Sequence, residues 1–133
     1  MTAVFADTFF YLALLNPRDS AHQRALDVSD KLSAPLLTTE FVLIEIADAL
    51  ASPAERPKFL ELIQSLRSAA SAMIVPASSE LLAQGVELYR RRPDKDWPLT
   101  DCISFVVMDN HGVADALTGD VHFVQAGYRA LML

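Results

Sequence analysis

Short apolar segments alternate along this chain with longer segments in which apolar residues recur at helical spacing. Val4 to Ala6 is an apolar run of the kind that forms a buried parallel strand, and a short helix through Tyr11 to Leu15 is predicted after it. Asn16-Pro17 ends that helix, because proline cannot continue it. Further strands are predicted at Leu36 to Thr38, Ala72 to Val75 and Ala114 to Leu117, with a short edge strand at Ala130 to Leu133.

The segments between these strands predict helices. Thr39 is expected to cap one of them, and His111-Gly112 is expected to end another through a glycine C-cap. Strands that alternate with helices of about ten to fifteen residues predict βαβ units, so the fold class is α/β with a mostly parallel sheet of four to five strands between helices. The expected helices run from Ser20 to a break before Pro35, from Thr39 to Ser52-Pro53, from Ala54 to Ala70, from Leu81 to Arg91 and from Leu99 to Asn110.

Length and composition place residues 1–133 in a single globular domain. Hydrophobic residues make up 52% of the chain and charged residues 21%, which suits a folded core. The net charge of −6 argues against a general basic face for nucleic acid, so any nucleic-acid chemistry must be local or metal-mediated. Cys102 is the one cysteine and is expected in the core. No apolar run approaches the roughly 20 residues that span a bilayer and no leader is recognisable, so a cytoplasmic protein without membrane insertion is expected.

Four carboxylates stand where the apolar pattern does not favour them. Asp7 follows the first strand directly, and Glu45 lies inside an almost wholly apolar helix, where an unpaired buried charge would cost several kcal/mol. Asp101 opens a late helix and Asp120 follows the fourth strand. If the first and fourth strands are neighbours, all four converge at the carboxyl edge of the sheet, where open α/β sheets bind ligands.

Such a cluster favours one kind of chemistry. Converging carboxylates repel one another and their pKa values rise, whereas Mg²⁺ or Mn²⁺ takes oxygen ligands and neutralises the charge. Carboxylates that leave metal positions open can activate a water and stabilise the charge of a phosphodiester under attack. The predicted reaction is therefore metal-assisted phosphodiester hydrolysis.

Three of the four carboxylates also have an ordinary structural interpretation, whereas Glu45, near the middle of its helix, is harder to explain in that way. Asp7 could merely cap the helix after it, and Asp101 could be a favourable first-turn charge beside a Thr100 cap. Asp120 could be a turn residue after Gly119. Only the joint placement of all four favours a functional site.

These residues also carry a family resemblance that spans essentially the whole chain. The chain resembles PIN-domain proteins of the small ribonuclease-toxin type (VapC-like), with an Asp after the first strand, a Glu in the helix after the second, an Asp opening a later helix and a Thr-x-Asp after the fourth strand. In this sequence the matching residues are Asp7 with Thr8, Glu45, Asp101 within LTDCISF, and Thr118-Gly119-Asp120 before His122-Phe123.

The resemblance implies a three-layer α/β/α PIN-like fold and an Mg²⁺- or Mn²⁺-dependent endoribonuclease. It implies that Asp7, Glu45, Asp101 and Asp120 are both the catalytic set and the metal ligands. Thr118, and likewise Thr8, would steady the site by hydroxyl hydrogen bonds. It further implies an RNA substrate, a cognate antitoxin whose tail enters the acidic site, and a homodimer.

Several other residues keep two interpretations. Arg90, Arg91 and Arg92 could steer RNA phosphates toward the acidic site, or could simply stabilise a helix C-terminus. The three histidines lack ligand spacing, and His122 is distinguished only by its closeness to Asp120.

Asp96 and Asp115 are extra acids near the motifs. Asp96 is expected to cap a helix, although either of them could replace Asp120 in the site. Two other functions compete with the nuclease: a receiver-like Mg²⁺-binding signalling module and a catalytically inactive PIN-fold binding protein. The receiver lacks support, because no lysine follows Leu117.

Overall fold

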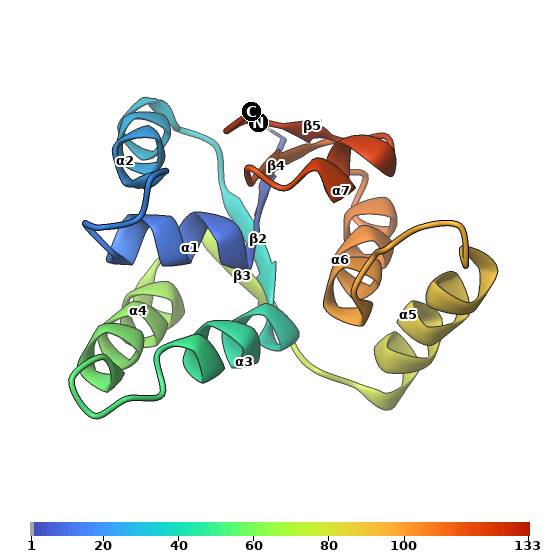
Figure 1. Ribbon diagram of the computed structural model, residues 1–133, viewed down its shortest axis with the longest axis horizontal. Coiled ribbons are helices and arrows are strands. Elements are labelled where there is room, and N and C mark those ends of the chain that lie inside the picture. Colours follow the sequence, from blue (N-terminus) through green and yellow to red (C-terminus); the bar gives the residue numbers. More distant parts are fainter. Residues whose placement is uncertain (1) are drawn as a thin grey trace.

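The computed structural model describes residues 2–133, which form an α/β fold around one parallel sheet (Figure 1). Its strands are β1 (Val4–Ala6), β2 (Leu36–Thr39), β3 (Ala72–Val75), β4 (Asp115–Leu117) and β5 (Arg129–Ala130). Its helices are α1 (Thr8–Leu15), α2 (His22–Lys31), α3 (Glu40–Ala49), α4 (Arg56–Ser68), α5 (Ser79–Arg91), α6 (Leu99–Asn110) and α7 (Val121–Gln125). Within these residues no helix has the length and apolarity needed to cross a bilayer.

The strand order places the ends of β1 and β4 side by side. The sheet runs β3-β2-β1-β4-β5 and every pairing is parallel, with Ala6 of β1 opposite Leu117 of β4. The chain builds outward from β1 in one direction through β3 and then in the other through β5, so β1 and β4 flank a topological switch point. The residues that follow these two strands therefore lie at the edge where this fold type opens a crevice.

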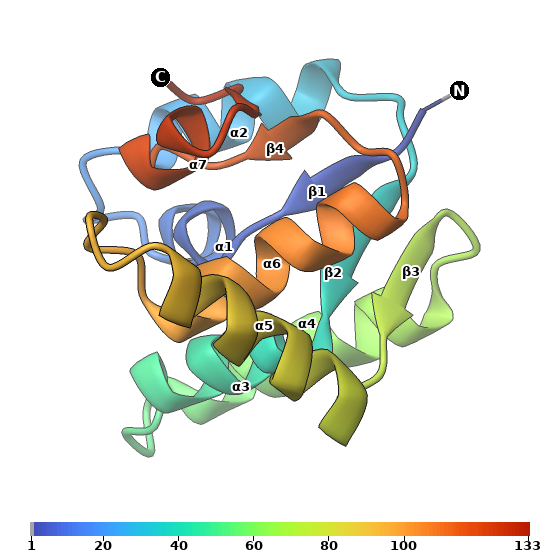
Figure 2. The same cartoon turned by 90° about the vertical axis from the view of Figure 1, so that its right-hand side faces the viewer.

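Helices cover both faces of the sheet, which confirms the three-layer α/β/α prediction. α1, α2 and α4 lie on one side, and α6 lies on the other with α5 outside it (Figures 1 and 2). α3 contacts α1 and α4 as well as α6. α5 approaches α6 closely at Gly85, where an added Cβ would lie 2.3 Å from Cγ1 of Ile103. Glycine is therefore required at that crossing.

An aromatic cluster supports the sheet beneath α6 and α7. Phe105 of α6 packs edge-on against Phe123 of α7 at 5.0 Å between ring centroids and against Trp97 at 5.1 Å. Phe123 in turn contacts Phe5 of β1, so the cluster joins both terminal regions of the chain. Trp97 also donates from its indole N–H to Oε1 of Gln125 at 3.0 Å. These contacts fix the start of α6 relative to α7.

Most predicted elements are confirmed, and the differences lie at their ends. Thr39 caps α3 by accepting from the Val42 amide at 3.1 Å, and Gly112 ends α6 with a φ of 64°. The prediction that Asp96 caps α6 is wrong, as is the Thr100 cap, because Pro98 occupies the N-cap position. The helix α7 was not predicted, since its five residues are too few to show a helical period.

Candidate active site

Asp7 lies at the junction of β1 and α1, where only 3% of its surface is exposed. It occupies the N-cap position of α1, but its side chain makes no capping bond there, so the simple cap interpretation is wrong. Its Oδ2 instead accepts a 2.9 Å hydrogen bond from the hydroxyl of Thr118. Burial raises the pKa of Asp7 to about 7, and the charge of Asp101 adds to this effect, while the bond from Thr118 opposes it.

A tight turn after β4 links Asp7 to Asp120. Thr118 is fully buried, and its hydroxyl accepts from the Asp120 amide at 3.0 Å while it donates to Asp7. Oδ1 of Asp120 accepts from the His122 amide at 2.9 Å and so caps α7. Asp120 therefore has a structural role, and its backbone amide is linked to Asp7 through the Thr118 hydroxyl. The hydroxyl hydrogen bond expected of Thr118 is formed.

Asp101 enters the crevice from the first turn of α6 and is 6% exposed. Burial raises its pKa to about 6, and the charges of Asp120 and Glu45 act in the same direction. A hydrogen bond with His122 opposes these effects. Asp101 is repelled by the neighbouring carboxylates and accepts few hydrogen bonds. This combination is typical of a cation-binding site.

Glu45 lies on α3, and its burial differs from the prediction. It is half-buried rather than enclosed, because α3 buries Val42, Leu43 and Ile46 while Ile44 is 55% exposed. The cost of a buried charge is therefore smaller than the sequence suggested. Its negative charge nonetheless raises the pKa of both Asp7 and Asp101. The structure thus brings all four predicted carboxylates into one electrostatic cluster.

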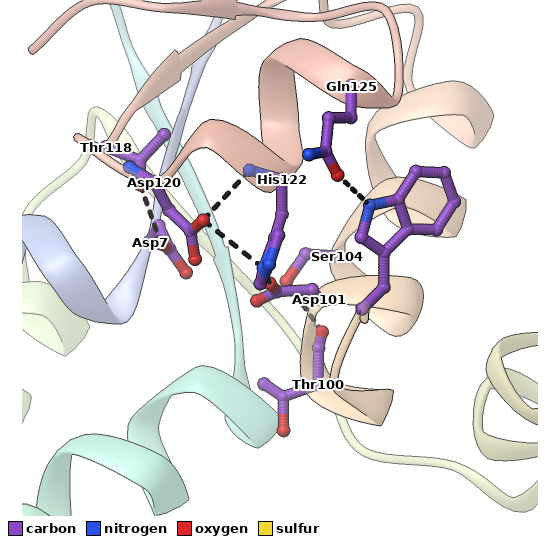
Figure 3. A network of polar contacts seen from close by, with 9 residues as sticks. Asp7, Thr100, Asp101, Ser104, Thr118, Asp120, His122 and Gln125 are labelled. Carbon is purple, nitrogen blue, oxygen red and sulfur yellow. Dashed lines mark hydrogen bonds and ion pairs between the residues drawn. The ribbon is translucent and has the colours of Figure 1, made fainter. Parts of the chain in front are cut away.

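His122 joins this cluster, which the sequence did not predict. Its Nδ1 lies 3.0 Å from Oδ2 of Asp101 and 3.2 Å from Oδ1 of Asp120 (Figure 3). One ligand atom from each of these three residues falls within 4.8 Å of the others. A histidine two positions after a helix-capping Asp was the available signal, but it could be used only once α7 was known to begin there.

A divalent cation fits this set of residues. The carboxylate oxygens suit Mg²⁺, Mn²⁺ or a similar ion, and one imidazole nitrogen lies beside them. The hydroxyl of Thr8, next to Asp7, is buried and has no hydrogen-bond partner among residues 2–133. The expected hydrogen bond from Thr8 to the site is therefore not formed within the protein. A buried hydroxyl without a partner fits a site that is completed by a hydrated ion or a substrate.

The extra acids lie elsewhere. Asp115 begins β4, at the opposite end from Asp120, and pairs with Arg129 at 2.7 Å. Asp96 lines a surface groove with Lys95 and Trp97. Neither contributes to the charges that raise the pKa values of Asp7 and Asp101.

The predicted basic cluster lies beside an open groove of about 1030 Å³ between the end of α5 and the start of α6. Arg90 pairs with Glu87 at 2.6 Å, and Arg92 pairs with Asp94 at 3.0 Å while it stacks over the ring of Trp97. The groove is lined by Val86, Tyr89, Arg90, Arg92, Pro93, Lys95, Asp96, Trp97, Pro98, Leu99 and Cys102. Since Cys102 directly follows Asp101, one end of the groove reaches the helix turn that carries the site.

Comparison with known proteins identifies the fold. No protein-family model and no curated protein sequence matches the chain. The chain is similar to the structure of VapC20 from Mycobacterium tuberculosis, described as a sarcin–ricin-loop-cleaving toxin, with 24% identity, a TM-score of 0.85, and coverage of 94% of this chain and 95% of that one.

Two further solved structures share this fold. VapBC2 from Rickettsia felis, bound to a DNA fragment from its promoter, is 11% identical with a TM-score of 0.67 over 97% of this chain and 96% of that one. FitAcB from Neisseria gonorrhoeae is 17% identical with a TM-score of 0.64 over 96% of this chain and 94% of that one. The chain has the PIN fold of these proteins along almost its whole length.

Proposed function

We propose that this protein is a metal-dependent endoribonuclease that hydrolyses phosphodiester bonds in RNA, and that it is the toxin of a toxin–antitoxin pair. Asp7, Glu45, Asp101 and Asp120 are its catalytic, metal-binding carboxylates. The observation that carries the proposal is that four segments far apart in sequence deliver acids to the β1–β4 crevice, where burial and the neighbouring negative charges raise the pKa values of Asp7 and Asp101. The likeness to VapC20, a toxin with the same fold, supports the reaction class.

The residues of the crevice have different roles. Thr118 holds Asp7 in place through its hydroxyl, and Asp120 is held by the Thr118 hydroxyl and the start of α7. A bound Mg²⁺ or Mn²⁺ supplies the polarisation of the phosphodiester and of the attacking water. Without the metal, the raised pKa values leave Asp7 partly protonated near neutral pH and Asp101 less so.

The groove between α5 and α6 is the proposed RNA path. Arg90 and Arg92 form exposed ion pairs, which contribute little stability and exchange readily for phosphate contacts, and Arg92 also lies over the Trp97 ring. Tyr89 is 56% exposed among these cations, and bases stack on such rings. Arg91, 3.8 Å from Glu87, adds charge at the same helix end. The groove leads to the turn of α6 that bears Asp101.

The expected protein partners are a cognate antitoxin at the acidic crevice and a second copy of the chain at α1. A cognate antitoxin that inserts a cationic side chain into the acidic crevice would neutralise it and exclude the metal. VapBC2, which has this fold, is bound to promoter DNA, so a complex with an antitoxin that contacts DNA is the expected assembly. A homodimer in the cytoplasm is the expected state of the toxin, with the apolar α1 as its surface, where Phe9 is 37% exposed.

Two alternative functions compete with this proposal. A receiver-like module has the strand order 2-1-3-4-5, whereas this sheet has the order 3-2-1-4-5, so the fold argues against it. A binding protein without catalysis is the remaining alternative. It would have no need for four mutually repelling acids in one crevice.

Cleavage of RNA by antitoxin-free protein tests the proposal. The substrates are a mixed RNA pool and an oligonucleotide of the sarcin–ricin loop, each with Mg²⁺, with Mn²⁺ or with EDTA. We expect fragments with either metal, none with EDTA and none from Asp101→Asn, while Asp30→Asn, an exposed carboxylate on α2, cleaves normally. Equal cleavage by Asp101→Asn would remove Asp101 from the catalytic set. No cleavage with any metal would favour the binding protein.

A further inference from the structure

We propose that His122 is itself a metal ligand, which gives this site a preference for Mn²⁺ and chemically similar first-row ions over Mg²⁺. This inference rests on the proposed function in one respect, namely that the crevice binds a divalent cation. It goes beyond that function by adding a nitrogen ligand to the four carboxylates and by assigning the metal preference to one residue.

The spacing of the donor atoms carries the proposal. Nδ1 of His122 lies 3.0 Å from Oδ2 of Asp101 and 3.2 Å from Oδ1 of Asp120. Adjacent ligand atoms that each lie about 2.1 Å from an octahedral ion are about 3.0 Å from one another. Nδ1 therefore already has the separation of a neighbouring ligand from each of the two carboxylate oxygens, and all three ligand atoms lie within 4.8 Å of one another.

His122 is held firmly in this position. Its amide is bound by Asp120, and its carbonyl accepts from the Ala126 amide at 3.0 Å. The next residue, Phe123, is fully buried against Phe105, which anchors α7 to the helix that carries Asp101. The imidazole thus faces Asp101 because both of its flanks are fixed. A ligand fixed in advance loses little conformational freedom on binding.

The other two histidines differ from His122 in their surroundings. Nδ1 of His22 contacts the carbonyl of Ala13 at 2.8 Å, and Nδ1 of His111 contacts the carbonyl of Val107 at 3.0 Å. Both are ordinary contacts to the backbone. Among the described residues, the His122 ring is the one that contacts two carboxylates, and those carboxylates belong to the candidate site.

The chemistry of the ligand sets the metal preference. Mg²⁺ favours oxygen ligands and retains its waters, whereas first-row transition ions also accept nitrogen ligands, with an affinity for a mixed nitrogen and oxygen site that increases from Mn²⁺ to Cu²⁺. Coordination through Nδ1 requires a neutral imidazole that carries its proton on Nε2, so any proton on Nδ1 must leave to solvent as the ion binds, and Nε2 must hold a proton or take one up from solvent.

The test measures metal binding directly. Mn²⁺ bound to antitoxin-free wild type is examined by electron spin echo envelope modulation, and dissociation constants for Mn²⁺ and Mg²⁺ are measured by calorimetry. We expect an imidazole nitrogen coupling that disappears in His122→Ala, a loss of Mn²⁺ affinity of about tenfold or more, and a change in Mg²⁺ affinity of less than about threefold. His111→Ala is the matched control and leaves all three quantities unchanged.

Other outcomes overturn the inference in distinguishable ways. Bound Mn²⁺ without nitrogen coupling shows that His122 is not a ligand. Tighter binding of both metals by His122→Ala shows that the histidine merely occupies the place of the cation and competes with it. In both cases the carboxylate site survives. Failure of wild type to bind either metal would overturn the proposed function as well. His122→Gln, which retains a polar side chain, together with a melting curve for each variant, excludes misfolding as the cause of any loss.

Discussion

The acidic crevice at β1 and β4 and the groove between α5 and α6 both have carboxylates, but the pKa values of these carboxylates shift in opposite directions. In the crevice, burial raises the pKa of Asp7 to about 7 and that of Asp101 to about 6. At the groove, the hydrogen bond from Arg92 lowers the pKa of Asp94 to about 2, and Arg90 likewise lowers the pKa of Glu87. Among residues 2–133 no arginine or lysine pairs with the acids of the crevice, whereas Glu87 and Asp94 beside the groove each pair with an arginine.

The two regions differ in their pKa shifts because their charged residues come from different distances along the sequence. The groove pairs come from neighbours such as Glu87 and Arg90 on one helix, so they form wherever α5 forms. The crevice charges come from β1, α3, α6 and the turn before α7, and only the completed fold brings them together. The unfavourable cluster persists because the core around it is well packed. Such a local conflict in an otherwise consistent fold is typical of a functional site.

Asp7→Asn is expected to produce the largest effect, because it should lower the activity while it raises the stability of the metal-free protein. RNA cleavage should fall at least about a hundredfold, because the metal loses a ligand. The metal-free protein should become more stable at pH 7.5 by on the order of 1–3 kcal/mol, since an amide removes a buried charge and can still accept from Thr118. Cleavage assays and denaturant titration measure the two quantities.

The control for Asp7→Asn is Asp30→Asn, on the exposed face of α2. It should change neither quantity measurably. A destabilised Asp7→Asn would mean that the ionised carboxylate supports the fold, and the contrast between crevice and surface would then fail.

The metal-free protein should lose stability as the pH rises from about 4 to about 7. The folded-state pKa values of Asp7 and Asp101 exceed the unfolded value of about 3.9, so in this range the folded chain keeps protons that the unfolded chain releases. The loss is on the order of a few kcal/mol, and saturating Mn²⁺ should reduce it. Urea titrations at pH 5 and pH 8 measure it. Higher stability at pH 8 without metal would contradict the unfavourable charge cluster in the crevice.

Gly85→Ala should weaken the packing that joins the groove to the crevice. Its new Cβ would lie 2.3 Å from the buried Ile103, so overpacking costs about 1–3 kcal/mol, and the better helix propensity of alanine returns up to about 1 kcal/mol. Thermal melting measures the net loss. Gln84→Ala, at the exposed neighbouring position on α5, should melt no lower than wild type. Equal melting temperatures for both variants would show that α5 can shift without cost.

The smallest effect is expected from Arg90→Gln combined with Arg92→Gln. The KM for RNA should rise about threefold to tenfold while kcat stays the same, and the salt dependence of binding should weaken because the protein neutralises fewer phosphates. Stability should change by less than about 1 kcal/mol, because both ion pairs are exposed. A fall in kcat with KM unchanged would show that the arginines do not act through RNA binding.

The sequence predicted the sheet and the positions of the four acids well, because each depends on local signals. The apolar run of β1 ends at Asp7, and the cap at Thr39 sets the register of α3, so both acids could be assigned before the fold was known. The Thr118 hydroxyl bond was implied by the family resemblance and not by a local signal.

The remaining details depend on contacts between distant segments. Whether Glu45 is enclosed or half-buried depends on which face of α3 meets α1 and α6, and no local pattern fixes that face. His122 reaches Asp101 only because Phe105 and Phe123 pack α6 against α7. The cap of α6 fell at Pro98 rather than Asp96 because the preceding loop is held by Trp97 in the core, which its polar sequence did not reveal.

The most direct test of the crevice as a metal site is the melting temperature of antitoxin-free protein with and without saturating Mn²⁺, measured for wild type and for Asp7→Asn at pH 7.5. An ion that binds only the folded state raises its stability, and about 2.7 kcal/mol is gained at a hundred times the dissociation constant. We expect a rise of several degrees for wild type and little or none for the variant. Equal shifts for both proteins, or no shift for wild type, would contradict the assignment of the crevice as a metal site.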